Sequence, residues 1–118
     1  MKDSAGRITR YLFGEMEIDT RKYTEDVIIN GDEVIGNWRR RKGHHLEIDD
    51  IPREFRENIT HIIIGTGYYG MMSVSSSFGD YCKLSRILLE SMRTSEAVEW
   101  FNECSEGNNL LGAFHLTC

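Results

Sequence analysis

Apolar and polar positions divide the chain into a β-rich first part and an alternating second part. Loose alternation over 7–13 predicts one strand, and a second short strand is expected over 15–18. Two β-rich runs, 26–30 and 33–38, flank an Asn-Gly-Asp turn and therefore predict a hairpin. The continuous apolar run over 60–65 predicts a strand that is buried on both faces, as in a parallel sheet.

In the second part, helical and extended patterns follow each other. A capping Asp and a proline predict a short helix over 51–58. A helix over 74–84 is expected despite its serines and its glycine, which lower helix propensity. Strands are then predicted over 86–92 and 109–118, and a well-capped helix over 95–107 separates them.

A β-rich start followed by a β-α-β-α-β order predicts the α/β class. We expect a three-layer single domain over 1–118, with a central mixed sheet flanked by helices and an added N-terminal β-hairpin region. The length of 118 residues suits one domain with one sizeable core.

Composition and charge argue against some classes of function. The 14 basic and 19 acidic side chains give a net charge of -5, which argues against general nucleic-acid binding. No apolar run approaches the length of a membrane helix. The three cysteines are scattered and form no CxxC pair, so they are expected to be reduced thiols in a cytoplasmic protein.

Gly65-x-Gly67-x-x-Gly70 follows the buried strand and has the spacing of the dinucleotide-binding fingerprint. The strand before it fits, and Glu90 stands 20 positions after Gly70, where a ribose-binding acid is expected. The required helix does not fit, because the residues after the loop alternate like a strand. The glycines then serve either a tight, closely packed turn or a nest of N–H groups that binds a phosphate or carboxylate.

The run from Trp38 to His45 holds four consecutive cations beside an aromatic side chain, a pattern typical of phosphate or RNA contact. Acidic residues follow at once, so a solvated loop is the default interpretation. Arg40 remains able to hold a carboxylate or phosphate through two hydrogen bonds. His44 and His45 would point to opposite sides of a strand, and no metal-ligand spacing occurs, so no metal site is predicted. The predicted anion site consists of Gly65, Thr66, Gly67, Gly70, Arg40 and His44.

Together these features resemble a known family, the small Mth-type domain of adipogenesis-associated proteins, mitochondrial complex I assembly factors and many archaeal and bacterial proteins. The resemblance covers about Phe13 to Cys118. It implies a three-layer α/β domain with an added β-hairpin region and without established catalysis, and its eukaryotic members are associated with the assembly of, or interaction with, other proteins. Arg86, Arg93 and Phe101 depart from the family pattern of Gly, Pro and Tyr. The pieces that carry the resemblance are Asp26-Val27-Ile28-Ile29, Trp38 with Arg40, Gly43-His44-x-Leu46, Ile64-Gly65-Thr66-Gly67, Gly70-x-Met72-x-Val74, Thr94-x-Glu96-Ala97-Val98, Asn102 and His115-Leu116-Thr117-Cys118.

We therefore expect a non-catalytic domain that acts by protein contact, as an assembly or regulatory factor, and that is a monomer or a weak homodimer. The alternative is a small-anion or nucleotide-binding protein that uses the glycine loop, residues 65–70. A weaker third interpretation, an enzyme of unknown reaction, needs Arg40, His44, Thr66 or Cys118 to meet in one cleft. No cofactor, nucleic-acid partner or membrane partner is expected. Whether the 38–46 loop and the glycine loop line one pocket separates these hypotheses.

Overall fold

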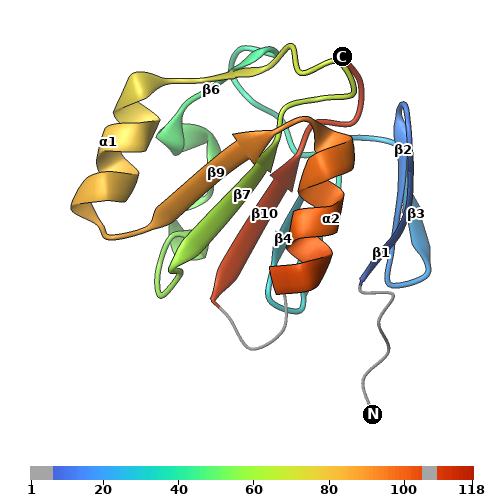
Figure 1. Ribbon diagram of the computed structural model, residues 1–118, viewed down its shortest axis with the longest axis horizontal. Helices are drawn as coiled ribbons and strands as arrows, with labels where there is room; N and C mark the ends of the chain where they lie inside the picture. Colours follow the sequence, from blue (N-terminus) through green and yellow to red (C-terminus); the bar gives the residue numbers. More distant parts are fainter. Residues whose placement is uncertain (1–6, 105–108) are drawn as a thin grey trace.

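The computed structural model describes residues 7–104 and 109–118, and its centre is a mixed five-stranded sheet with the order β5-β4-β10-β7-β9 (Figure 1). β10 pairs in parallel with β7 and antiparallel with β4, while β9 extends the parallel part at the edge. The strands are β4 (Val27–Asn30), β5 (Glu33–Ile35), β7 (His61–Gly65), β9 (Leu88–Met92) and β10 (Leu110–Phe114).

Helices cover both faces of this sheet, α1 (Ser76–Leu84) on one side and α2 (Thr94–Cys104) on the other (Figure 1). Because side chains alternate along a strand, Ile62 and Ile64 pack with Phe78 of α1, whereas Ile63 packs with Phe101 of α2. All five side chains are buried. The predicted double-sided burial of this strand and the predicted three-layer α/β class are therefore confirmed.

The N-terminal region forms a separate antiparallel sheet of β1 (Ile8–Leu12), β2 (Glu15–Ile18) and β3 (Arg21–Tyr23) beside α2 (Figure 1). Met16 and Ile18 enter the core on the α2 side of the central sheet. The side chain of Asn102 accepts a hydrogen bond from the Ile8 N–H at 3.1 Å and donates one to the Ile8 carbonyl at 2.8 Å. The predicted hairpin region is present, with a third strand that the sequence did not indicate.

The helix predicted over 51–58 is wrong: the structure has only the 3₁₀ turn η2 (Arg53–Phe55) within this range, after a first turn, η1 (Ile48–Asp50). Ile51 and Pro52 have extended backbone, with ψ of 123° and 138°, and Asn58 has a φ of 63°, so no α-helix fits between them. The helix expected from Val74 begins later because Ser75 caps it, accepting the Phe78 N–H at 3.1 Å. The residues before that cap form β8 (Ser73–Val74), which pairs in parallel with β6 (His45–Leu46).

The second predicted helix ends at Cys104 in the described part of the chain, and the remaining positions expected to be helical, 105–107, lie outside the described residues. Among the described residues, neither helix is long and apolar enough to cross a membrane.

Candidate functional site

The carboxyl ends of three parallel strands meet at one edge of the central sheet. The glycine loop follows β7, Thr94 follows β9, and a C-terminal segment, His115–Cys118, follows β10. β4 runs antiparallel to β10 with Val27 opposite Phe114, so Asp26, just before β4, lies beside His115 at the same edge. Strand direction thus brings together groups far apart in the sequence.

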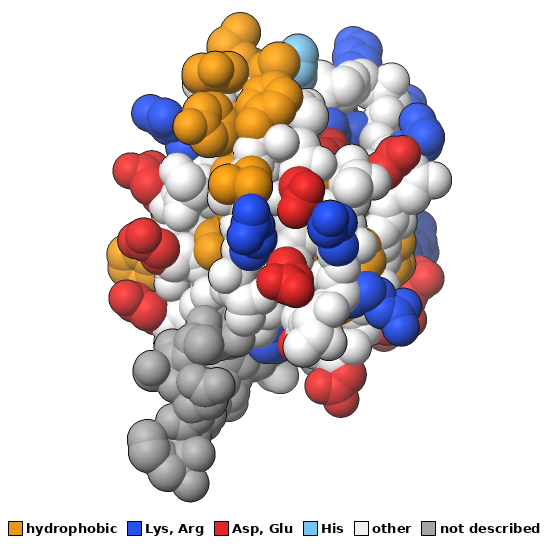
Figure 2. Space-filling model, turned by 90° about the vertical axis from the view of Figure 1, so that its right-hand side faces the viewer, with side chains coloured by type: hydrophobic (Ala, Val, Ile, Leu, Met, Phe, Trp, Pro, Cys, Tyr) orange, Lys and Arg blue, Asp and Glu red, His pale blue; other side chains and the backbone are white. Residues whose placement is uncertain are grey.

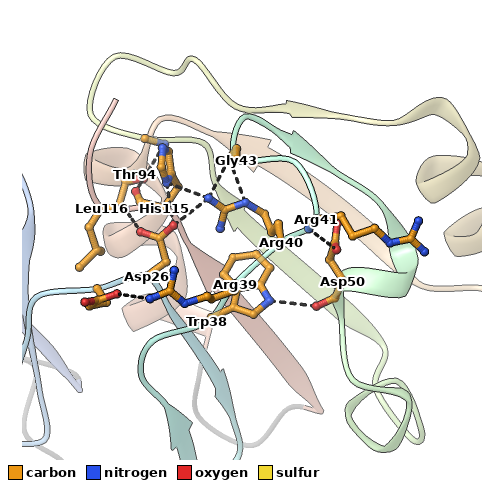
Figure 3. A network of polar contacts seen from close by, with 12 residues as sticks. Asp26, Trp38, Arg39, Arg40, Arg41, Gly43, Asp50, Thr94, His115 and Leu116 are labelled. Carbon is orange, nitrogen blue, oxygen red and sulfur yellow. Dashed lines mark hydrogen bonds and ion pairs between the residues drawn. The ribbon is translucent and has the colours of Figure 1, made fainter.

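Asp26 is the centre of a buried charge network (Figure 3). Its Oδ2 lies 2.8 Å from Arg40 Nη2 and 2.8 Å from His115 Nδ1, while its Oδ1 accepts the Leu116 N–H at 2.8 Å. Burial would raise the pKa of the Asp26 carboxyl, but the hydrogen bonds from His115 and Leu116 and the charges of His115 and Arg40 outweigh it and hold this pKa below its usual range. Asp26 is therefore a carboxylate that ties the C-terminal segment to the sheet.

Arg40 is buried in this network, with only 5% of its side chain exposed. The guanidinium lies 4.7 Å from the ring centre of Trp38 and donates to the Gly43 carbonyl from Nε at 3.0 Å and from Nη2 at 2.8 Å (Figure 3). Its Nη2 is also 3.2 Å from His115 Nδ1. That nitrogen lies closer to the Asp26 carboxylate, so we place the imidazole proton there, and Arg40 then has no acceptor on His115.

Two atoms of this network have no hydrogen-bond partner among the described residues, Arg40 Nη1 and His115 Nε2. The aromatic face of Trp38 offers the guanidinium a partial electrostatic substitute. The His115 ring is met edge-on by the His44 ring at 5.4 Å. His115 is therefore buried and, among the described residues, hydrogen-bonded through one ring nitrogen only.

Most N–H groups of the glycine loop already donate to protein acceptors. Gly67 N–H donates to Thr94 Oγ1 at 2.8 Å, and Tyr68 N–H donates to the Thr117 carbonyl at 2.6 Å. Directly after the loop, Met71 N–H donates to Cys118 O at 2.9 Å. A nest needs adjacent free N–H groups, and these donors bind the C-terminal segment and its neighbour instead.

Each glycine of the fingerprint has a backbone reason. A Cβ on Gly67 would lie 2.5 Å from Cys118 O, and its φ is +113°. Gly70 has a φ of +73°, and a Cβ on Gly65 would meet Thr94 Oγ1 at 2.8 Å. The helix that a dinucleotide fold requires here is absent, since α1 begins only at Ser76, and the supposed ribose acid lies in the middle of β9. Positive φ at Gly67 and Gly70 and close packing at Gly65 and Gly67 therefore account for the glycines.

The two loops that were expected to form one site contact different parts of His115. His115 N–H donates to the Gly65 carbonyl at 2.9 Å, while the His115 side chain faces Arg40 and His44. A cavity of about 290 Å³ beside Arg40 is lined by 24–26, 38–40, Gly43 and Thr117 and includes no residue of the glycine loop. An anion site at Arg40, His44 and the loop stays a prediction, with most of its donors engaged elsewhere.

The same edge of the molecule carries an exposed aromatic cluster. Phe13, from the β1–β2 turn, lies 5.7 Å from Tyr68 and 6.1 Å from Tyr69, measured between ring centres, and the two tyrosines are 5.0 Å apart. Tyr69 is 63% exposed and Phe13 49%. We call Leu12, Phe13, Tyr68, Tyr69 and Met71 the aromatic patch; Figure 2 shows hydrophobic side chains gathered at this end of the molecule.

Residues 8–115 match the model of a family described as a protein of unknown function (DUF498/DUF598). The chain belongs to this family. The match covers nearly the whole of the described chain, so the resemblance to Mth-type domains that the sequence indicated is confirmed.

Solved structures similar to this DUF498 chain share its fold. A conserved hypothetical protein, PH1505 from Pyrococcus horikoshii OT3, has 22% identity and a TM-score of 0.78, over 94% of this chain and 98% of that one. A protein described as an outer membrane protein from Bartonella henselae has 21% identity and a TM-score of 0.78, over 96% of each chain. A Bordetella pertussis protein described as a Mth938-like domain has 14% identity and a TM-score of 0.67, over 98% of this chain and 89% of that one. At these identities the likeness establishes the fold alone.

Sequence reasoning missed two features of this DUF498 domain. Asp26 entered only as part of a family motif, because its partners stand far away in the sequence. The aromatic patch did leave a signal: Tyr68 and Tyr69 are adjacent, inside a loop with three glycines, where a turn leaves little room to bury both rings. A search for large apolar residues inside predicted turns would have found the aromatic patch from the sequence.

Proposed function

We propose that this domain is non-catalytic and acts by contact with another protein, as an assembly or regulatory factor, through the aromatic patch. The observation that carries the proposal is the set of mutually packed, exposed rings of Phe13, Tyr68 and Tyr69. Contiguous exposed apolar patches on soluble proteins mark interaction sites, and aromatic residues dominate the binding energy of protein interfaces.

The patch is also held in place before any partner arrives. The N–H groups of Tyr68 and Met71 are fixed on the C-terminal segment, and the Gly14 N–H and the Tyr11 hydroxyl both donate to the Leu116 carbonyl at 2.9 Å. Both loops of the patch are thus braced on the same segment. Side chains that are already ordered lose less entropy on binding, which favours a contact surface.

The polar groups near the patch support a structural role over a catalytic one. Both oxygens of the Asp26 carboxylate accept hydrogen bonds, from Arg40, His115 and Leu116, and the carboxylate is largely buried. Burial raises the pKa of Tyr11 to about 12 against a hydrogen bond with Thr94 that lowers it, and the phenol donates to the Leu116 carbonyl. These groups fix the C-terminal segment and have little freedom to react with a substrate.

A photo-crosslinking amino acid placed at position 69 in cells tests the proposal. We expect a covalent adduct of defined mass when the probe replaces Tyr69, and none when it replaces Leu84, which is 86% exposed on the far end of α1. Adding Phe13→Ser to the Tyr69 probe should remove the adduct. The same adducts at both positions, or none at position 69, would reject contact through the patch.

A further inference from the structure

One side of β9 has no backbone partner among the described residues, because β9 is an edge strand of the central sheet and pairs with β7 alone (Figure 1). On the β7 side, the Leu88 N–H donates to the Thr60 carbonyl at 3.0 Å. The backbone groups of successive strand residues point to opposite sides, so those of Leu89 and Ser91 point away from β7. The outer edge of β9 therefore presents unpaired N–H and C=O groups with the spacing of a β-ladder.

An apolar groove lies beside this edge, on the side of α1. Its volume is about 310 Å³, and it is lined by Gly79, Cys82 and Lys83 of α1 and by 87–89. Leu88 is 55% exposed there. Gly79 lies within α1, where a glycine lowers helix stability, and a Cβ built on it would meet no atom within 4 Å. Packing within the described chain does not require this glycine, and its missing side chain leaves room in the groove.

The other face of the edge carries two carboxylates. Glu90 is in register with Ile63, which packs on the α2 side, so its side chain points to that side as well. Burial raises the pKa of the Cys104 thiol, and the charges of Glu103 and Glu90 add to this effect, so both carboxylates lie near that thiol. No cation of the described residues, Arg86 included, forms an ion pair with either carboxylate. The edge thus has an apolar groove on one face and unpaired negative charge on the other.

From these features we propose that the outer edge of β9 is a second docking surface, which binds an extended segment of another protein as an added strand. The segment pairs its backbone with Leu89 and Ser91. Its aliphatic side chains enter the groove beside α1, and the alternate side chains, Lys or Arg, face Glu90. In this mode of recognition main-chain hydrogen bonds supply affinity and alternate side chains supply specificity. The surface shares no residue with the aromatic patch, so the inference is independent of the proposed function.

A second copy of the chain fits this edge less well than a basic segment. Its own β9 carries one glutamate and no lysine or arginine, so that strand brings no cation to Glu90. Two copies also carry a net charge of -5 each, which disfavours their approach and attracts a basic partner.

Selection from a phage-displayed library of random peptides against the full chain, followed by fluorescence anisotropy with the strongest synthetic peptide, tests the proposal. We expect a peptide in which aliphatic residues alternate with Lys or Arg. Ser91→Pro removes an outward N–H and spares the bonds to β7, so it should weaken binding about tenfold. Gly79→Leu fills the groove and should also weaken binding about tenfold. Leu84→Ala, at an exposed position of α1 outside the groove lining, should bind like the wild type.

A charge reversal tests the basic character of the partner. Glu90→Lys should weaken the same peptide about fivefold, and a peptide with its basic residues changed to Glu should recover binding to Glu90→Lys. Asp32→Lys, on the β4–β5 turn, changes the net charge by the same amount and should alter binding less than about twofold. Tyr69→Ala should bind like the wild type. Circular dichroism establishes that each variant is folded.

Other outcomes would overturn the inference. A library that yields no peptide, or peptides that bind Gly79→Leu and Ser91→Pro like the wild type, would exclude strand addition at β9. Equal effects of Glu90→Lys and Asp32→Lys would exclude a basic partner. Peptides lost only in Tyr69→Ala would overturn this inference and support contact through the aromatic patch. A dimer in sedimentation equilibrium that Ser91→Pro dissociates would replace the proposed partner with a second copy.

Discussion

Asp26→Asn is the substitution that tests most directly how the C-terminal edge is held together. It keeps the size of the side chain but removes the charge that faces Arg40 and His115. The new amide oxygen is still able to accept the Leu116 N–H. The change thus isolates the charge from the shape of the network.

The expected loss follows from burial. Arg40 is 5% exposed and Asp26 14%, and removal of one partner from a buried ion pair costs roughly 3–5 kcal/mol. Because one hydrogen bond survives, we expect about 3 kcal/mol of destabilisation. For a chain of this length that corresponds to a fall in Tm of about 12 °C.

Urea unfolding followed by circular dichroism measures this loss, with Asp32→Asn on the exposed β4–β5 turn as the matched control. The control should change stability by less than about 0.5 kcal/mol. In the double variant Asp26→Asn/Arg40→Met, the cost should be smaller than the sum of the two single costs by about 1 kcal/mol or more, since no uncompensated cation remains. A loss below about 1 kcal/mol in Asp26→Asn, or additive single costs, would refute a buried charge network here.

The same substitution predicts a change with pH. The pKa of Asp26 is lower in the folded chain than in the unfolded one, so the unfolded state binds the proton first as pH falls. The stabilisation is complete above the unfolded pKa of about 3.9 and is lost as pH falls through the folded pKa. The stability difference between wild type and Asp26→Asn should therefore shrink below about pH 4; a difference that is constant from neutral to acid pH would contradict this assignment.

The remaining predictions concern the glycine loop and its neighbour in α2. Gly67→Ala should destabilise the chain by about 2 kcal/mol, because the φ of Gly67 is +113° and the new Cβ would meet Cys118 O. Gly79→Ala should stabilise the chain by about 0.5–1 kcal/mol, because Gly79 lies within α1 and no atom obstructs a Cβ there. Thr94→Val leaves the Gly67 N–H and the His115 carbonyl without their shared hydroxyl and should cost about 2 kcal/mol. Urea midpoints measure all three, and equal midpoints for the two glycine variants would reject the packing account.

Much of the fold was predictable because burial imposes a period on the sequence. The run Ile62–Ile64 predicted a strand covered on both faces, and the structure buries its residues against α1 and α2 in alternation. The pattern failed over 51–58 although Ile51 and Phe55 are both buried there, because Ile51 and Pro52 have extended backbone and Asn58 has a positive φ. Too few residues remain between them for an α-helix, and apolar periodicity does not report such local backbone detail.

The candidate site was predictable only in part, because its contacts join distant positions. Asp26 and His115 are 89 residues apart, and a register between β4 and β10 brings them within 2.8 Å. The sequence indicated that Arg40 is able to hold a carboxylate or phosphate, and in the structure Arg40 forms an ion pair with the carboxylate of Asp26. No spacing rule connects three such positions without the strand order of the sheet.

The sequence allowed two interpretations of the glycine loop, an anion-binding nest and a tight turn. The hydrogen bonds of the loop favour the tight turn, because they use N–H groups that a nest would need free. The N–H groups of Tyr68 and Met71 point inward to the C-terminal segment, which leaves the side chains at 68, 69 and 71 at the surface. These hydrogen bonds make the two N–H groups unavailable to an anion. The same bonds fix the loop so that the side chains of the aromatic patch face outward. A domain that bound phosphate at this loop would have to release the C-terminal segment first. Millimolar phosphate should therefore leave the amide NMR shifts of Tyr68 and Met71 unchanged, and large shifts there would restore the anion site at the expense of the contact surface.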